Sequence, residues 1–288
     1  MIPISNSLCT YAIIDGSQVE NLAQNIYSNI DIIDAFPIYV MTELESIKSV
    51  SPWVIKLTKA DQHNGWLRKV IKHNQGFIFY SQSTLEEVVQ HWQTLIKVKL
   101  IQGQTYLFRV ADPQIFNTIF SSSTDAQKSR LMGVISEVYF LINHEWQSIT
   151  WESSDSETEI QPLGDAWLTL TDPQVTGLES LVYVKQVDAL SQHIQTYFPS
   201  AAQSDSYAQA QSYISTSTDL GFETVSDCYY FTNLVCRLGE ECYQNDNYPD
   251  IKNLIYHTSL DTPSQRIQKA AELAKHYLNI EDKGASHV

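Results

Sequence analysis

The stretch from Tyr106 to Ile115, Tyr-Leu-Phe-Arg-Val-Ala-Asp-Pro-Gln-Ile, constrains the fold more than any other part of this chain. Its apolar run predicts a buried strand that ends at the charged residues Arg109 and Asp112. Asp112 and Pro113 predict the start of a helix. An Asp side chain accepts hydrogen bonds from the free N–H groups of a first turn, and Pro has no N–H to lose there. The segment therefore predicts a strand that leads directly into a helix.

The first half of the sequence alternates between strand-like and helix-like periodicity. Short apolar runs predict strands, and the runs between them have helical spacing. Ser83 and Glu86 have the spacing of a capping box at the start of one such helix. A hairpin is predicted around Gly103, and the apolar runs are Tyr11–Asp15, Pro52–Leu57, Gly76–Tyr80, 98–101, 106–111, Val138–Ile142 and Gln147–Trp151. Strands mixed with helices and hairpins predict an α/β lobe with a mixed sheet.

The second half is predicted to be almost wholly helical. Thr171-Asp172-Pro173 and Thr262-Pro263 are helix-start signals, and Gly221 and Gly239 follow apolar helical patterns as C-terminal caps do. Between the halves, an acidic and Ser-rich segment begins at Glu152 and is typical of a solvated linker. We therefore expect an α/β lobe at 1–151, a linker at 152–166 and an all-helical lobe at 167–288.

Charge and composition exclude several classes of function. The 288 residues carry a net charge of −15, with a net of −2 in residues 1–149 and −13 in residues 150–288. This balance argues against nucleic acid or an anionic membrane as a partner, because both require basic surfaces, and it permits a basic protein partner. No apolar run approaches the length of a membrane span, and the first residues lack the pattern of a secretory signal, so the expected location is the cytoplasm.

No arrangement of residues predicts catalysis directly. The sequence has no Gly-x-Ser-x-Gly elbow and no Cys-x-x-Cys pair, its eight His residues are scattered, and Gly16 alone does not make a phosphate-binding loop. We therefore predict no metal, no cofactor and no catalytic residue.

Asp15 and Asp112 support the one enzymatic alternative. Two carboxylates at strand ends can hold magnesium, as in phosphotransferases. The competing interpretation is structural: Asp112 caps its helix, and Arg109 pairs with a carboxylate such as Asp15, because a half-buried guanidinium needs an anionic partner. We favour the structural interpretation.

The order of these motifs resembles one known family. The residues that carry the resemblance are Tyr11 with Asp15-Gly16, Pro52-Trp53, Gly76 with the strand after it, and Arg109 with Asp112-Pro113. In this order and spacing they resemble the effector chaperones, or adaptors, of bacterial type VI secretion. The ordered match covers about residues 11–142. The family often has Arg after the Asp-Pro pair, where this chain has Gln114.

The resemblance implies a cytoplasmic protein that is not an enzyme. Such adaptors bind a cognate toxic effector and help to place it on the VgrG spike, in some cases through a PAAR tip protein. The family motifs are interpreted as markers of the fold, so the resemblance assigns no partner-binding residue.

Overall fold

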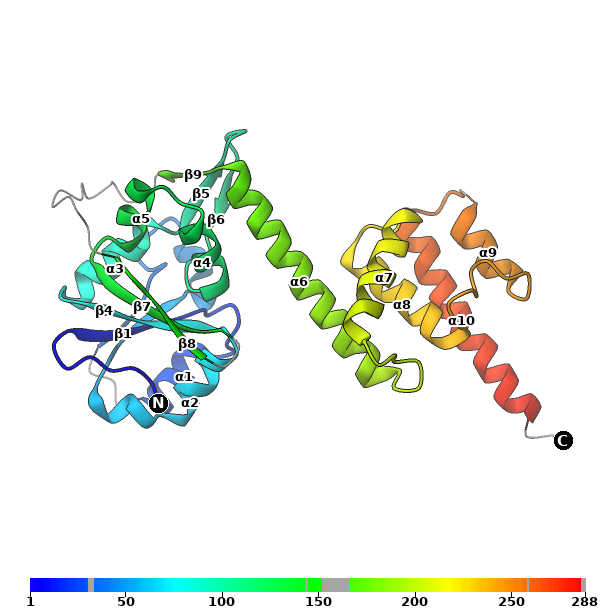
Figure 1. Cartoon of the computed structure of the whole chain (residues 1–288), viewed down its shortest axis with the longest axis horizontal. Helices are drawn as coiled ribbons and strands as arrows, with labels where there is room; N and C mark the ends of the chain where they lie inside the picture. Colours follow the sequence, from blue (N-terminus) through cyan, green and yellow to red (C-terminus); the bar gives the residue numbers. More distant parts are fainter. Residues whose placement is uncertain (31–33, 143–144, 152–165, 258, 286–288) are drawn as a thin grey trace. The chain divides into compact units, whose positions relative to one another are not determined.

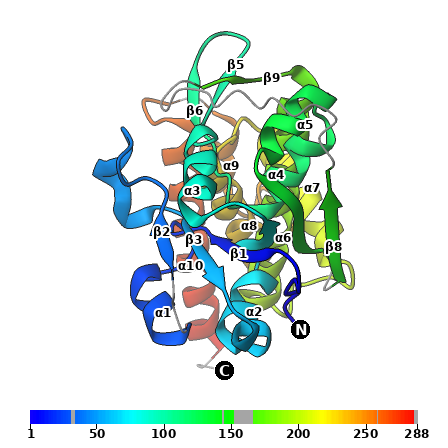
Figure 2. The same ribbon diagram turned by 90° about the vertical axis from the view of Figure 1, so that its left-hand side faces the viewer.

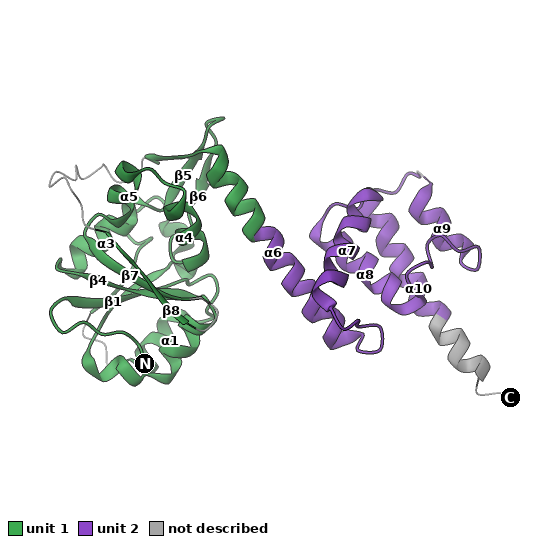
Figure 3. Cartoon of the chain, in the orientation of Figure 1, with its two compact units in different colours: residues 1–181 green, residues 182–288 purple. Residues whose placement is uncertain are grey.

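A computed structural model describes residues 1–30, 34–142, 145–151, 166–257 and 259–285. They form two compact units, Met1–Leu181 and Val182–Val288 (Figure 3). The first unit contains two sheets with helices, and the second is made of helices, so the predicted fold class is confirmed. The predicted linker at 152–166 lies almost wholly outside the described residues, and the lobe boundaries stay a prediction.

The larger sheet of the first unit has six strands in the order β2-β3-β1-β4-β7-β8, and all its pairings are antiparallel. Figure 1 labels β1, β4, β7 and β8 of this sheet. A second sheet has the order β6-β5-β9 and contains the parallel pairing, between β5 and β9. The strands are β1 Cys9–Ile14, β2 Ala35–Pro37, β3 Trp53–Leu57, β4 Gly76–Ser81, β5 Lys97–Leu100, β6 Thr105–Leu107, β7 Ile135–Ile142, β8 Glu145–Thr150 and β9 Leu168–Leu170.

Helices cover both faces of the six-stranded sheet. Helices α1 (Leu22–Asn29) and α2 (Gly65–Lys72) lie on one face, and α3 (Leu85–Thr94), α4 (Pro113–Ser121) and α5 (Asp125–Met132) lie on the other (Figure 2). Two short 3-10 helices, Glu45–Val50 and Lys59–His63, complete the unit. The central strands β1 and β4 are therefore buried on both sides, which explains why their sequences are continuously apolar.

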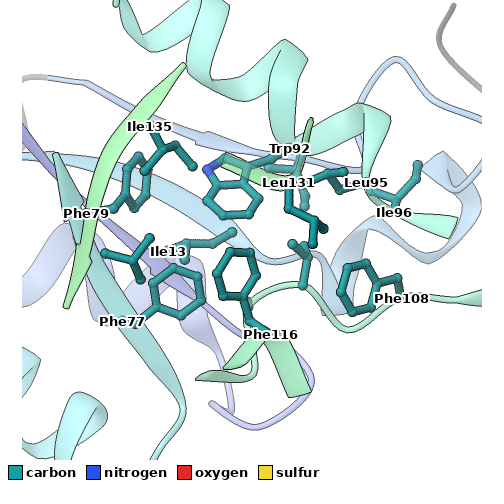
Figure 4. Packing of buried hydrophobic residues seen from close by; sticks show 14 of the residues in the cluster. Ile13, Phe77, Phe79, Trp92, Leu95, Ile96, Phe108, Phe116, Leu131 and Ile135 are labelled. Carbon is teal, nitrogen blue, oxygen red and sulfur yellow. The ribbon is translucent and has the colours of Figure 1, made fainter. Parts of the chain in front are cut away.

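The alternation of side chains along the central strands divides the core into two clusters. Tyr11 and Ile13 of β1 pack with Phe77 and Phe79 of β4 against Trp92 and the other residues on the α3–α5 face. Figure 4 shows Ile13, Phe77, Phe79 and Trp92 in this cluster. Their neighbours in sequence, such as Ala12 and Ile78, face α1 and α2. A one-residue slip of either strand would exchange the two clusters, so the hydrophobic pattern fixes the register.

Two predictions from the sequence are wrong here. The residues 106–111 do not form one buried strand: β6 stops at Leu107 and all three of its residues are exposed. The buried residues that follow, Phe108, Val110 and Ala111, lie in a turn where the N–H of Val110 donates to the carbonyl of Phe108 at 2.8 Å. Hydrophobicity correctly predicted burial there, but burial does not require a strand.

The capping box of α3 also differs from the prediction. It is formed by Thr84 and Glu87, one residue later than the predicted Ser83 and Glu86. Ser83 has other partners: its carbonyl accepts a hydrogen bond from the Tyr11 hydroxyl at 2.8 Å, and its N–H donates to Ser81 Oγ. Both spacings fit a capping box, and the structure uses the later one.

In the second unit, helices pack around a separate core. Helix α6 (Asp172–Tyr197) begins in the first unit, and its residues Val187, Leu190 and Ile194 belong to the core of the second. Residues Gly221 and Gly239 end helices with positive φ angles of 83° and 92°, as predicted. The remaining helices are α7 Ser206–Asp219, α8 Val225–Leu238, α9 Pro249–Tyr256 and α10 Pro263–Ala285.

Candidate functional site

Asp15 is the centre of the residues that the motifs singled out. Its carboxylate is buried and uses both oxygens. Oδ1 accepts hydrogen bonds from the N–H of Ser17 at 2.8 Å and from its hydroxyl at 2.6 Å. Oδ2 accepts from Gln18 Nε2 at 3.2 Å and from Arg109 Nη2 at 2.8 Å. The predicted ion pair between Asp15 and Arg109 is therefore present.

The charge of Asp15 is stabilised by these partners. Burial alone raises the pKa of a carboxyl group, but the hydrogen bonds from Ser17 and Arg109 outweigh burial and lower the pKa of Asp15 below its ordinary value. Asp15 is thus an anion at neutral pH with four donors in place.

Arg109 connects two parts of the chain that are far apart in sequence. Besides its bond to Asp15, its Nη2 lies 4.0 Å from Asp112 Oδ2. Asp112 caps α4 as predicted, because its Oδ1 accepts from the N–H groups of Gln114 and Ile115 at 3.0 and 3.2 Å. Phe108 and Phe116, which flank this segment, both point into the core cluster (Figure 4). We call Asp15, Arg109 and Asp112 the ion-pair cluster.

The turns of the ion-pair cluster do not end neighbouring strands. Asp15 follows β1 in the six-stranded sheet, whereas Arg109 and Asp112 follow β6 of the other sheet, with a turn between. The sequence placed Arg109 and Asp112 at the end of a buried strand, and this is wrong, because β6 stops at Leu107. The cluster instead joins the end of β1 to the segment between the second sheet and α4.

Two glycines of the motifs allow close backbone contacts. A Cβ on Gly16 would lie 2.2 Å from the carbonyl oxygen of Ser51, and a Cβ on Gly76 would lie 2.3 Å from that of Ile13. Pro52, next to Ser51, accepts a hydrogen bond at its carbonyl from the N–H of Ile38 at 2.9 Å. A larger residue at Gly16 or Gly76 would therefore force the neighbouring backbone to shift.

The two aromatic motif residues differ in burial. Tyr11 is fully buried and stacks on Phe79 with 5.4 Å between ring centroids. Burial raises the pKa of its hydroxyl, which donates to Ser83 as described above. Trp53 is half-buried and makes an edge contact with Tyr27 at 6.2 Å.

The carboxylates of the ion-pair cluster are bonded to other groups of the same chain. Both oxygens of Asp15 accept hydrogen bonds from the chain itself, and Asp112 Oδ1 is engaged by the helix. The described residues contain no group of three or more His, Cys, Asp or Glu side chains placed to hold a metal ion. Sequence reasoning found Asp15, Arg109 and Asp112 but missed Ser17, Gln18 and Ser51. The Asp-x-Ser spacing was a usable signal for Ser17, since Asp in a turn often binds the residue two positions later.

The protein is thus of the class in which an α/β domain, joined internally by an ion pair, is followed by a unit of helices. Comparisons with known proteins add to it. Residues 10–130 match the family model described as a domain of unknown function, DUF4123. The chain is also 28% identical over 271 residues to the accessory protein VasW of Vibrio cholerae serotype O1 (strain ATCC 39315 / El Tor Inaba N16961). That match covers 92% of this chain and 87% of VasW.

Both findings fit the family of type VI secretion effector chaperones and adaptors, so the resemblance stated from the motifs is confirmed. The match to the family model starts at residue 10 and includes every motif residue from Tyr11 to Pro113. No solved structure matches the chain significantly. No described helix is long and apolar enough to cross a membrane.

Proposed function

We propose that this protein is an adaptor of type VI secretion that binds a cognate toxic effector and helps to load it onto the VgrG spike, directly or through a PAAR tip protein. The observation that carries the proposal is the similarity to VasW, which extends over both units of the chain. A relative similar only in the α/β unit would have supported a shared fold alone.

The contacts of the ion-pair cluster support a structural role for its residues rather than a catalytic one. Asp15, Arg109 and Asp112 lie together, and their side chains bond to other groups of the same chain. We therefore propose that the protein is not an enzyme, takes no cofactor and acts in the cytoplasm. The magnesium-dependent phosphotransferase suggested by Asp15 and Asp112 has no further support, because Asp15 already has four hydrogen-bond donors.

Capture of partners by the tagged full chain tests the proposal. The protein is produced in cells that express a complete type VI cluster, and retained proteins are identified by mass spectrometry. We expect an effector, VgrG or a PAAR protein to be enriched over a capture with an unrelated tagged protein of similar charge. Retention of none of these partners would contradict the proposed function.

Titration calorimetry with magnesium tests the alternative. We expect no heat of binding at millimolar concentrations. Binding that disappears in the Asp15→Asn variant, while that variant stays folded, would favour the phosphotransferase instead.

A further inference from the structure

One surface of the first unit carries positive charges that have no carboxylate partner among the described residues. Helix α2 presents Arg68, Lys69, Lys72 and His73, all of them exposed. No carboxylate of a described residue lies within 4.0 Å of Arg68, Lys69 or Lys72. Three full positive charges in five residues are unusual for a chain with a net charge of −15.

These charges border a groove with an apolar floor. The groove has a volume of about 660 Å³, and no Asp or Glu is among the described residues that line it. Ile71 of α2, Leu141 of β7 and Trp146 of β8 supply its apolar surface. The groove therefore brings α2 together with β7 and β8 of the six-stranded sheet. We call this site the basic groove.

Helix α2 alone does not account for this arrangement. Lys69 and Lys72 in the last turn interact favourably with the helix dipole, which explains basic residues there in general. The dipole does not explain why Arg68 lies beside them, or why the charges surround an apolar hollow that includes a Trp from another element. Positive charge around an apolar surface is complementary to a ligand with negative charges and apolar side chains.

We infer that the basic groove binds a short acidic peptide segment of a partner protein, with an apolar side chain of that segment on Leu141 and Trp146. This inference rests on the proposed adaptor function and names a surface for it. A volume of this size accommodates a few side chains. Salt screens interactions between charges that lie more than ~10 Å apart, so a short segment in the groove interacts mainly with the positive charges there. A long polyanion would also be repelled by the net negative charge of the whole chain.

A charge-neutralising variant tests the groove in the full-length protein. The variant R68Q/K69Q/K72Q removes the three charges, and K48Q/K59Q/K99Q is the matched control, which loses the same charge elsewhere in the first unit. The probe is a labelled short peptide in which Glu alternates with Leu and Phe, and fluorescence anisotropy measures its binding. Comparison probes of equal length are a peptide with Gln for Glu, a peptide with Ser for Leu and Phe, and a single-stranded oligonucleotide.

We expect the wild type to bind the acidic apolar peptide better than the other three probes. The groove variant should bind it about tenfold more weakly, because it loses several partly exposed ion pairs, and the control should stay within about twofold of the wild type. Equal losses in both variants would show a general effect of charge and overturn the inference. Preference for the oligonucleotide, or equal binding of the Ser peptide, would also overturn it.

Capture of type VI partners distinguishes failure of the groove from failure of the proposed function. If the wild type and the groove variant retain the same partners equally, the adaptor function stands and the groove is not their binding site. If the wild type retains no partner, the proposed function fails, while peptide binding still decides whether the groove recognises acidic segments.

Discussion

The ion-pair cluster and the basic groove lie in the same unit, but they differ in whether their charged side chains have partners within the chain. In the cluster, the carboxylate of Asp15 is buried and each of its oxygens accepts two hydrogen bonds. In the groove, Arg68, Lys69 and Lys72 are exposed and no carboxylate of a described residue pairs with them. Charges with internal partners stabilise a fold, whereas exposed charges around an apolar hollow are available to another molecule. The recognisable motif and the binding surface are therefore different parts of the protein.

The largest effect should follow from filling the close contact beside the ion-pair cluster. In Gly16→Ala, the new Cβ would lie 2.2 Å from the backbone oxygen of Ser51, so the two segments must separate. We expect the free energy of unfolding to fall by about 3 kcal/mol or more. Chemical denaturation of the purified protein measures this loss.

Gly65→Ala is the control from the groove side. Gly65 begins α2, and nothing lies within 4 Å of a Cβ there. We expect no loss of stability, and a gain of up to about 1 kcal/mol from the higher helix propensity of Ala. Similar losses for the two alanine variants would contradict the distinction between a tightly packed cluster and an open groove.

The next largest effect should come from removing the anion of the cluster. Asp15→Ala deletes the acceptor of four hydrogen bonds and leaves Arg109 without this partner. Because the Arg109 side chain is 41% exposed, water replaces part of the loss, and we expect a decrease of about 2–3 kcal/mol in unfolding free energy.

Lys48→Ala is the comparison for an ion pair on the surface. Lys48 and Glu45 are 61% and 51% exposed, so its removal should cost less than about 0.5 kcal/mol. Denaturation curves of both variants measure the difference. Equal losses of unfolding free energy would contradict the larger contribution expected of Asp15.

A pH effect of intermediate size should come from His91, which lies on the opposite side of the sheet from α2. Burial lowers the pKa of His91 to about 4, and its Nε2 lies 3.0 Å from the carbonyl oxygen of Leu131. Between pH 6.5 and pH 4 the unfolded chain therefore binds a proton that the folded chain does not, so stability falls as the pH falls through this range. We expect His91 to account for a loss of about 2 kcal/mol between pH 7 and pH 5.

Denaturation of the wild type and of His91→Gln at several pH values isolates this contribution. The variant should lose less stability than the wild type between pH 7 and pH 5. Parallel curves for the two proteins would show that His91 titrates normally in the folded state.

The effect of the groove charges on stability should be smaller than that of Asp15 or His91. R68Q/K69Q/K72Q removes exposed side chains, and only the favourable interaction with the end of α2 is lost. We expect less than about 1 kcal/mol in unfolding free energy. A larger loss would mean that the three residues stabilise the fold, and the contrast with the ion-pair cluster would fail.

Local patterns predicted the parts of the fold that depend on local physics. Tyr11–Asp15 and Gly76–Tyr80 gave two central strands because continuous apolar runs belong to strands buried on both faces. Asp112-Pro113 gave the start of α4, since a cap depends on neighbouring residues alone. The pairing of Arg109 with Asp15 was also predictable, because a half-buried Arg needs a carboxylate and few were placed to supply it.

Local patterns could not predict contacts between segments that are distant in the sequence. No local spacing predicts the contact of Gly16 with Ser51 or the hydrogen bond from the Tyr11 hydroxyl to the carbonyl of Ser83. The groove was missed for the same reason. Its charges stand together in the sequence, but Leu141 and Trp146 reach them only after the sheet has formed.

The most direct test is the amount of type VI partner retained per mole of folded protein by two variants of the full chain. The account predicts that Asp15→Asn, corrected for its folded fraction, retains the partner at the level of the wild type, and that R68Q/K69Q/K72Q retains much less. Loss of the partner by folded Asp15→Asn, with normal retention by the groove variant, would contradict it.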